Sequence, residues 1–184
     1  SVLQIVTGKV RFSYCNVVEP SAKSEGDKEK YSICLLIPKS DKKTVKAIQD
    51  AVEAAKQDGK SIIADRNGKI PSNIKTPLRD GDEERSDDPN FEGMYFLNAS
   101  SLRRPSIVDK DLNPIMDKSE FYSGCYGRAS LNFFAYNVSS KGIAAGLNNL
   151  QKLEDGEPLG GGSSAEDDFG GDNTWESNDD DDMF

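Results

Sequence analysis

The sequence contains no histidine, and this removes the most common general base from the candidate chemistry. It also removes the Ser-His and Cys-His nucleophile pairs and the usual zinc ligand. The sequence therefore predicts a protein that is not an enzyme, with no catalytic residue, no metal site and no cofactor. A metal-dependent nuclease is the poorest alternative, because its carboxylates would come from a Gly- and Pro-punctuated stretch that is typical of a solvated loop. These carboxylates are Asp80, Asp82, Glu83, Glu84, Asp87 and Asp88.

Cysteine is scarce: Cys15, Cys34 and Cys125 are an odd number without close spacing. This pattern favours reduced, half-buried cysteines in strands over disulfides or a metal site. No apolar run approaches the ~20 residues that a helix needs to cross a bilayer. The first residues lack the basic and apolar segments of a secretory signal. We therefore expect a cytoplasmic protein without a membrane partner.

Basic residues are missing from the last part of the chain. All 23 Lys and Arg lie at or before Lys152, whereas 12 of the 32 Asp and Glu lie from Glu154 onward. The first 153 residues thus carry 20 acidic and 23 basic residues, so the total charge of −9 divides into +3 for the body and −12 for the tail. This division suggests a basic body that meets a polyanion and a tail that imitates one.

The tail begins with a Gly- and Ser-rich linker over residues 160–164 and cannot bury enough apolar surface to offset its chain entropy. We expect one folded domain over residues 1–153 and a disordered linker and acidic tail over 154–184. The end of the tail combines four carboxylates with an apolar and an aromatic residue, which favours a partner-binding element over a simple solubility tail. Its residues are Asp179, Asp180, Asp181, Asp182, Met183 and Phe184.

β-Branched and aromatic residues predict five or so strands in the body. The first is long and bends near Gly8, and its alternation places one apolar face against one polar face. The apolar face comprises Val10, Phe12 and Tyr14, and the polar face comprises Lys9, Arg11 and Ser13. Further strands are predicted at 31–37, at 94–98 and within 121–138, where Gly124 and Gly127 indicate a bulge or tight bend. Residues 142–153 fit a strand or a helix.

A single helix is predicted between the second and third strands. Apolar residues recur at helical spacing from Val45 to Ala55, after a cap at Ser40 or Asp41 and before Gly59. The following residues, 59–92, have the composition of a loop. The order of elements shows no βαβ alternation, so a mainly β fold is expected: an antiparallel barrel or sandwich with one helix and long loops.

One face of the last aromatic strand is a candidate binding surface. Residues of one parity combine a cation, small polar groups and two rings, whereas the apolar residues between them form an ordinary core face. Such a mixture suits stacking on bases and contact with phosphates, although packing of both rings in a second layer remains open. The outward residues are Arg128, Ser130, Asn132, Phe134 and Tyr136.

Other cations and aromatics repeat this pattern more weakly, and a net positive body favours a nucleic-acid groove that they would line. These candidates are Lys9, Arg11, Lys75, Arg79, Arg103, Arg104, Tyr122 and Tyr126. A flexible tail of ~30 residues spans on the order of 30 Å, enough to reach such a groove. Tethering keeps its local concentration high, so its carboxylates would occupy the phosphate sites until single-stranded DNA displaces them.

The arrangement of a small barrel, a Gly-rich linker and an acidic tail ending in Phe184 resembles the single-stranded DNA-binding proteins of replication, which bear an OB-fold. Residues 142–161, Ser123-Gly-Cys-Tyr126 and Pro38-Lys-Ser-Asp41 are similar to a phage-encoded branch of that group, long classed as a domain of unknown function. The resemblance covers nearly the whole chain.

This resemblance implies a five-stranded OB barrel, sequence-tolerant binding of single-stranded DNA and no catalytic activity. It also implies roles in phage DNA replication, recombination and repair in an infected bacterial cell, with tail-mediated contact to replication or recombination proteins. A homodimer remains open. The alternative function is a protein-interaction module or nucleic-acid mimic in which the acidic tail is the active part and the body does not bind DNA.

Overall fold

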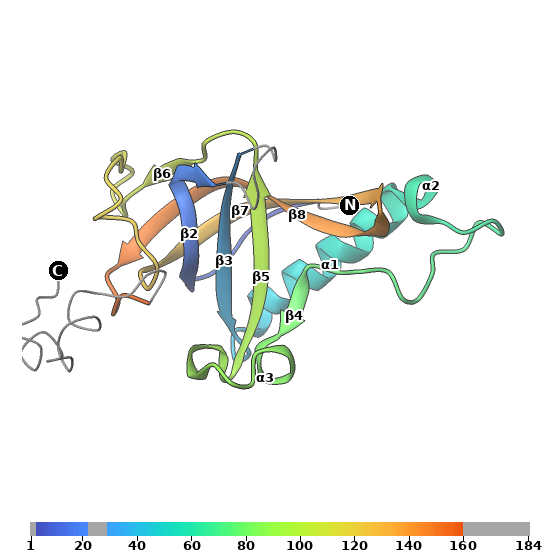
Figure 1. The fold of residues 1–184 in the computed structure, drawn as a ribbon, viewed down its shortest axis with the longest axis horizontal. Coiled ribbons are helices and arrows are strands. Elements are labelled where there is room, and N and C mark those ends of the chain that lie inside the picture. The colour runs from blue at the N-terminus through green and yellow to red at the C-terminus, as the bar shows by residue number, and fades with distance from the viewer. Residues whose placement is uncertain (1–2, 22–28, 160–184) are drawn as a thin grey trace, which may run out of the picture.

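The computed structural model describes residues 3–21 and 29–159 (Figure 1). The predictions for the acidic tail, including its disorder and its terminal residues Asp179–Phe184, therefore lie outside the described residues. Strands dominate the fold, as the sequence predicts. They are β1 (Gln4–Val6), β2 (Val10–Ser21), β3 (Lys30–Pro38), β4 (Leu78–Asp80), β5 (Met94–Ser101), β6 (Ser106–Val108), β7 (Tyr126–Val138) and β8 (Ser140–Glu154).

Five of these strands close a barrel in the order β2-β3-β5-β8-β7, because β7 pairs with both β8 and β2. The expected five-stranded barrel is thus confirmed, but it is not wholly antiparallel: β5 and β8 run parallel at Ala99↔Ala145 and Ser100↔Gly146. An odd number of strands cannot alternate in direction around a closed ring, so one parallel pair is unavoidable. β1, β4 and β6 extend the sheet at its margins.

The first strand breaks at the predicted bend. Gly8 lies between β1 and β2, and its N–H donates to Thr44 Oγ1 at 2.9 Å. The predicted alternation then fails at Tyr14, which is 46% exposed, whereas Ser13 is buried. The cause is a bulge: the β2–β3 register shifts between Ser13 and Asn16, and Tyr14 adopts a φ of 47°.

The predicted helix is α1 (Lys42–Asp58), and its cap is Asp41, whose carboxylate accepts from Thr44 N at 3.2 Å. Its buried stripe, which includes Ile48 and Val52, joins the barrel core. At its C-terminal end, Gly59 packs so closely on Ala135 of β7 that a Cβ would not fit. The helix therefore closes one end of the barrel, as Figure 1 shows.

Residues 59–92 are more ordered than the predicted loop. They contain α2 (Lys60–Ile63), α3 (Gly81–Glu84) and the 3-10 helix η1 (Pro89–Phe91) as well as β4. Acidic side chains start two of these turns: Asp80 accepts from Asp82 N at 2.9 Å and Asp88 from Asn90 N at 3.0 Å. Asp80 and Asp88 thus act as local caps. No group of three or more His, Cys, Asp or Glu that could hold a metal ion occurs in 3–21 or 29–159.

Residues 142–153, which fit either a strand or a helix, belong to β8. Together with β7 they form a long hairpin that turns at Ser139, where φ is 63°. Glycines in β8 leave space for side chains of β7. The ring of Tyr136 packs over Gly142, and the side-chain amide of Asn132 packs over Gly146. In the described part of the chain, no helix is long and apolar enough to span a membrane.

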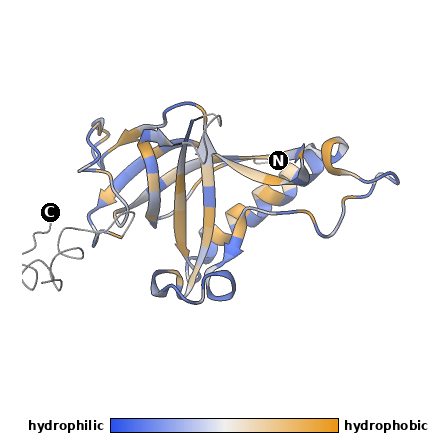
Figure 2. Ribbon diagram, viewed as in Figure 1, coloured by the Kyte–Doolittle hydropathy of each residue, from blue (hydrophilic) through white to orange (hydrophobic). Residues whose placement is uncertain are grey.

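Two apolar clusters have different positions. The larger fills the barrel and includes Phe12, Leu35 and Leu131, all of which are fully buried. The smaller lies on the outside of β3 and β5 and comprises Cys34, Leu36, Phe91 and Phe96. Figure 2 shows the hydrophobic colouring of β3 beside the hydrophilic residues of the α3 region. The outside of the β3–β5 pair is therefore partly apolar.

Candidate nucleic-acid interface

A cross-strand row of cations and apolar groups lies on the outside of the barrel. The register joins Tyr126 to Arg11, Arg11 to Leu36, Leu36 to Phe96 and Phe96 to Arg79. Each residue comes from a different strand, and the four steps of ~4.8 Å between strands make the row about 19 Å long. We call these five residues the outer row. Leu36 and Phe96 are buried in its centre, at 0% and 4% exposed, so the groups that the row presents to solvent are the half-buried Tyr126 and Arg11 at one end and the exposed Arg79 at the other.

Beside the outer row, the same faces of β2, β3 and β5 carry small side chains that leave the sheet surface shallow. They form the cross-strand sets Ser13–Cys34–Asn98 and Asn16–Ser32–Ser100. Burial raises the pKa of the Cys34 thiol, as it does that of Cys15, to about 12. Both thiols are therefore neutral and weakly reactive at neutral pH, in agreement with the prediction of reduced cysteines.

Arg85 and Tyr14 meet above this shallow surface. The Arg85 guanidinium lies 4.4 Å from the ring centroid of Phe91 and 5.8 Å from that of Tyr14. Arg85 Nη2 donates to the Tyr14 hydroxyl at 2.8 Å, and this bond is the largest cause of the raised pKa of Arg85. Phe91 in turn packs edge-to-face on Phe96, with centroids 5.2 Å apart. The outer row and the Arg85–Tyr14 pair are thus one continuous surface.

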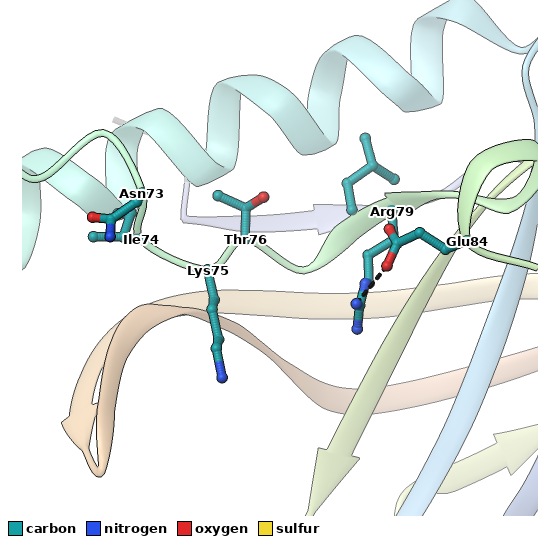
Figure 3. Close-up of a pocket in the computed structure, with 7 residues that line it drawn as sticks. Asn73, Ile74, Lys75, Thr76, Arg79 and Glu84 are labelled. Atoms are coloured by element: carbon teal, nitrogen blue, oxygen red, sulfur yellow. Dashed lines mark ion pairs between the residues drawn. The ribbon is translucent and has the colours of Figure 1, made fainter.

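Lys75 and Arg79 line a hollow of about 420 Å³ at the β4 end of the outer row. Figure 3 shows both side chains extending to the same side of the segment that leads into β4, with Arg79 paired to Glu84 at 2.5 Å. The Arg79 guanidinium also lies 5.8 Å from the Phe96 ring centroid. The backbone at Lys75 is fixed because Ile143 N donates to its carbonyl at 2.8 Å. The structure therefore brings these two predicted residues together.

Lys9, Arg11 and Tyr126 meet at the other end of the outer row. Lys9 Nζ and the Arg11 guanidinium each lie 5.3 Å from the Tyr126 ring centroid, and Lys9 pairs with Glu154. Arg11 is held by two backbone carbonyls, since it donates to Gly124 O at 3.1 Å and to Glu157 O at 2.6 Å. This second predicted group is therefore assembled as well, but its cations already have partners.

Residues 155–159, which we call the strap, follow β8 and lie across this face. Leu159 N donates to Ser123 O at 2.8 Å, and the Leu159 side chain packs on the outer cluster that contains Leu36 and Phe96. At Gly124, φ is +117° and a Cβ would collide with the carbonyl of Glu157, so only glycine fits. The predicted bend at Gly124 is thus the place where the strap docks, and the chain enters the acidic tail from the outer row.

The remaining predicted site residues lie elsewhere. Tyr122 precedes β7 and is held by the strap, since its hydroxyl donates to Asp155 at 2.8 Å and desolvation raises its pKa. Arg128 and Phe134 are exposed residues of β7, two and eight residues beyond Tyr126, and Arg128 donates to Thr7 O at 2.8 Å. Exposed Arg103 and Arg104 lie in the β5–β6 connection. Tyr136 covers Gly142, whose Cβ position also faces Lys75 O, and so borders the Lys75 segment.

Sequence reasoning missed Tyr14, Arg85, Phe91 and Phe96. Simple alternation places Tyr14 on the core face of its strand, because alternation carries no signal of the bulge. Arg85 lies among six acidic residues of a predicted loop, so the local composition gave no sign of an anion-binding group. The two phenylalanines form a separate apolar cluster outside the barrel, which an amphipathic pattern does not distinguish from the core.

Comparison with known proteins agrees with this architecture. The sequence model of the family described as "Enterobacter phage Enc34, ssDNA-binding protein" matches residues 3–184. The chain is 31% identical over 174 residues to putative protein p50 of Acyrthosiphon pisum secondary endosymbiont phage 1. The aligned residues cover 89% of this chain and 90% of that protein.

Two solved structures are similar to the fold. The single-stranded DNA-binding protein from bacteriophage Enc34 in complex with ssDNA has a TM-score of 0.74 and 28% identity, covering 86% of this chain and 90% of that chain. The bacteriophage T7 single-stranded DNA-binding protein gp2.5 has a TM-score of 0.62 and 13% identity, covering 88% and 97% of the two chains, a likeness of fold alone. Fold and sequence together place the chain in the Enc34 family: it is a member of this phage family of ssDNA-binding proteins, which are not enzymes.

Proposed function

We propose that this protein binds single-stranded DNA without sequence preference along the outer row. The observation that carries the proposal is the cross-strand order Tyr126–Arg11–Leu36–Phe96–Arg79 on a barrel whose family relative is solved with ssDNA. Aromatic rings stack on any base for ~1–3 kcal/mol each, and guanidinium groups bind phosphates, so neither contact reads the sequence.

We further propose that the acidic tail competes with DNA for this face and recruits other proteins of phage DNA replication, recombination or repair. The support is positional and electrostatic: the strap already joins the outer row through Arg11 and Leu159, and the residues from Glu154 onward carry 12 carboxylates and no cation. DNA would displace these carboxylates, and the released tail would then be free for partners. The host-cell cytoplasm, where replicating phage DNA is found, is the expected location.

Fluorescence anisotropy with a labelled oligo-dT tests both parts, with the full chain and a 1–159 truncation that retains every described strand and helix. Binding by both proteins, tighter for the truncation at low salt, is the expected result. Equal affinities at every salt concentration would remove tail competition. Absence of binding by both would leave the alternative function, an interaction module whose active part is the tail.

A pair of matched double variants locates the binding face. Arg79→Gln with Tyr126→Leu removes one cation and one solvent-accessible ring from the outer row, and Arg128→Gln with Phe134→Leu removes one cation and one exposed ring from further along β7. We expect the first pair to weaken oligo-dT binding at least tenfold and the second to change it less than twofold. The reverse order would move the binding face to β7, and circular dichroism on both variants checks that the barrel is intact.

A further inference from the structure

The Tyr14–Arg85 pair stands out on the outer surface because its backbone is strained. Tyr14 has a φ of 47°, in the left-handed region that costs a non-glycine residue roughly 1–2 kcal/mol. The bulge at Tyr14 turns the ring away from the core and leaves it 46% exposed, although the residue continues a strand whose Val10 and Phe12 are buried. Strain of this kind persists where the surrounding structure enforces it, and such positions concentrate at binding sites.

Arg85 is the best-placed anion-binding group on this surface. Lys39, Arg79 and Lys9 are each paired with a carboxylate, whereas Arg85 forms no ion pair within the described residues. Its guanidinium is nevertheless fixed, by the Phe91 ring at 4.4 Å on one side and by the Tyr14 hydroxyl at 2.8 Å. Because this hydrogen bond involves Nη2, the N–H groups on the other nitrogens of the Arg85 guanidinium remain available to a phosphate.

The segment that carries Arg85 is anchored on both sides. Lys39 pairs with Asp80 at 2.7 Å and with Asp82 at 2.8 Å, which ties α3 to the end of β3. On the other side, Phe91 is buried in the outer apolar cluster. The guanidinium therefore loses little further conformational entropy when it binds an anion.

We propose that Tyr14 and Arg85 form a one-nucleotide subsite, in which the Tyr14 ring stacks on a base and Arg85 binds the adjoining phosphate. The Tyr14 hydroxyl has a positioning role, because it accepts from Arg85 and keeps ring and guanidinium together. This inference rests on the proposed DNA-binding function and extends it by a subsite beside the outer row. The ligand is a nucleotide of any base within single-stranded DNA.

Oligo-dT and a matched oligonucleotide that lacks bases separate the two roles, because only the first allows stacking. In the full-length protein, Tyr14→Asn removes the ring, and asparagine tolerates a positive φ, so the bulge is preserved. We expect this variant to bind oligo-dT about 5- to 150-fold more weakly, the equivalent of ~1–3 kcal/mol per stacked base. Its loss on the abasic strand should be smaller, because there only the Arg85 contact, no longer positioned by the Tyr14 hydroxyl, is affected. Tyr14→Phe keeps the ring and should retain most of the oligo-dT affinity.

Arg85→Gln should weaken binding of both oligonucleotides and should reduce the slope of log K against log salt by about 0.7, the value for one phosphate contact in single strands. Lys46→Gln, on the exposed side of α1, removes the same charge and should leave the slope unchanged. Equal losses on both oligonucleotides for Tyr14→Asn, or a wild-type slope for Arg85→Gln, would overturn the subsite. Failure of the wild-type protein to bind oligo-dT would instead overturn the proposed function.

Discussion

The salt dependence of DNA binding follows from the number of cations on the outer surface. Five are positioned there: Lys9, Arg11, Lys75, Arg79 and Arg85. If each neutralises one phosphate, the slope of log K against log salt is about −3.5 for a single strand. Affinity should then fall by about 130-fold between 50 and 200 mM salt.

Removing two of these cations gives a quantitative test. The double variant Lys75→Gln/Arg79→Gln should have a slope of about −2.1 and lose only about 20-fold in affinity over the same range. The 1–159 truncation is the suitable background, because salt also weakens a competing tail and would flatten the slope of the full chain. Anisotropy of labelled oligo-dT at four or more salt concentrations provides the slopes.

The matched control is Lys43→Gln/Lys46→Gln, which removes the same charge from the exposed side of α1. It should keep the slope near −3.5, because neither lysine faces the outer row. If both double variants reduce the slope equally, binding responds to net charge rather than to position. The assignment of Lys75 and Arg79 to the DNA path would then be refuted.

Three further predictions concern the barrel itself. Gly127→Ala should destabilise it by about 1–3 kcal/mol or more in denaturant titrations, because a Cβ would overlap the carbonyl of Gln151; wild-type stability would contradict this packing. Cys34, with its pKa raised to about 12 by burial, should react with a thiol reagent at pH 8 about three orders of magnitude more slowly than a free cysteine; fast labelling of the native protein would exclude this burial. Lys39→Gln should lower the melting temperature at neutral pH, and the difference should vanish in acid. The hydrogen bond from Lys39 is the largest cause of the depressed pKa of Asp80. The stabilisation that this bond gives the folded state is therefore present above the ordinary carboxyl pKa and is lost as pH falls through the depressed value. A difference in melting temperature that persists at the lowest pH would contradict the pairing.

Local features of the fold were predictable from sequence because their signals are local. The helix from Lys42 to Asp58 follows from its cap at Asp41 and its apolar spacing, and the glycines before and within β7 indicated irregular backbone where the strap docks. The core parity of β7 was also predicted, since Leu131 and Phe133 are buried. In each case neighbouring residues carry the information.

The outer row was not predictable as a unit, because its residues come from five strands and the pairing register sets their proximity. Arg79 and Phe96 are cross-strand neighbours only because β4 joins β5 antiparallel. The prediction that Tyr14 faces the core was wrong for a different reason. A bulge exchanges the two faces of a strand, whereas periodicity assumes that the faces alternate without interruption. The sequence thus singled out Arg11 and Arg79 as candidates, but it did not indicate the surface on which the structure brings them together.

Amide hydrogen exchange of the full-length protein, with and without a saturating oligo-dT, tests most directly whether single-stranded DNA follows the outer row. Binding of oligo-dT should slow exchange at residues 11–14, 79–85 and 94–98, which carry the outer row and the Tyr14–Arg85 pair. Residues 128–134 of β7 serve as the internal reference and should be unchanged. Protection confined to 128–134, with no effect on β2, β4 and β5, would show that single-stranded DNA does not follow the outer row.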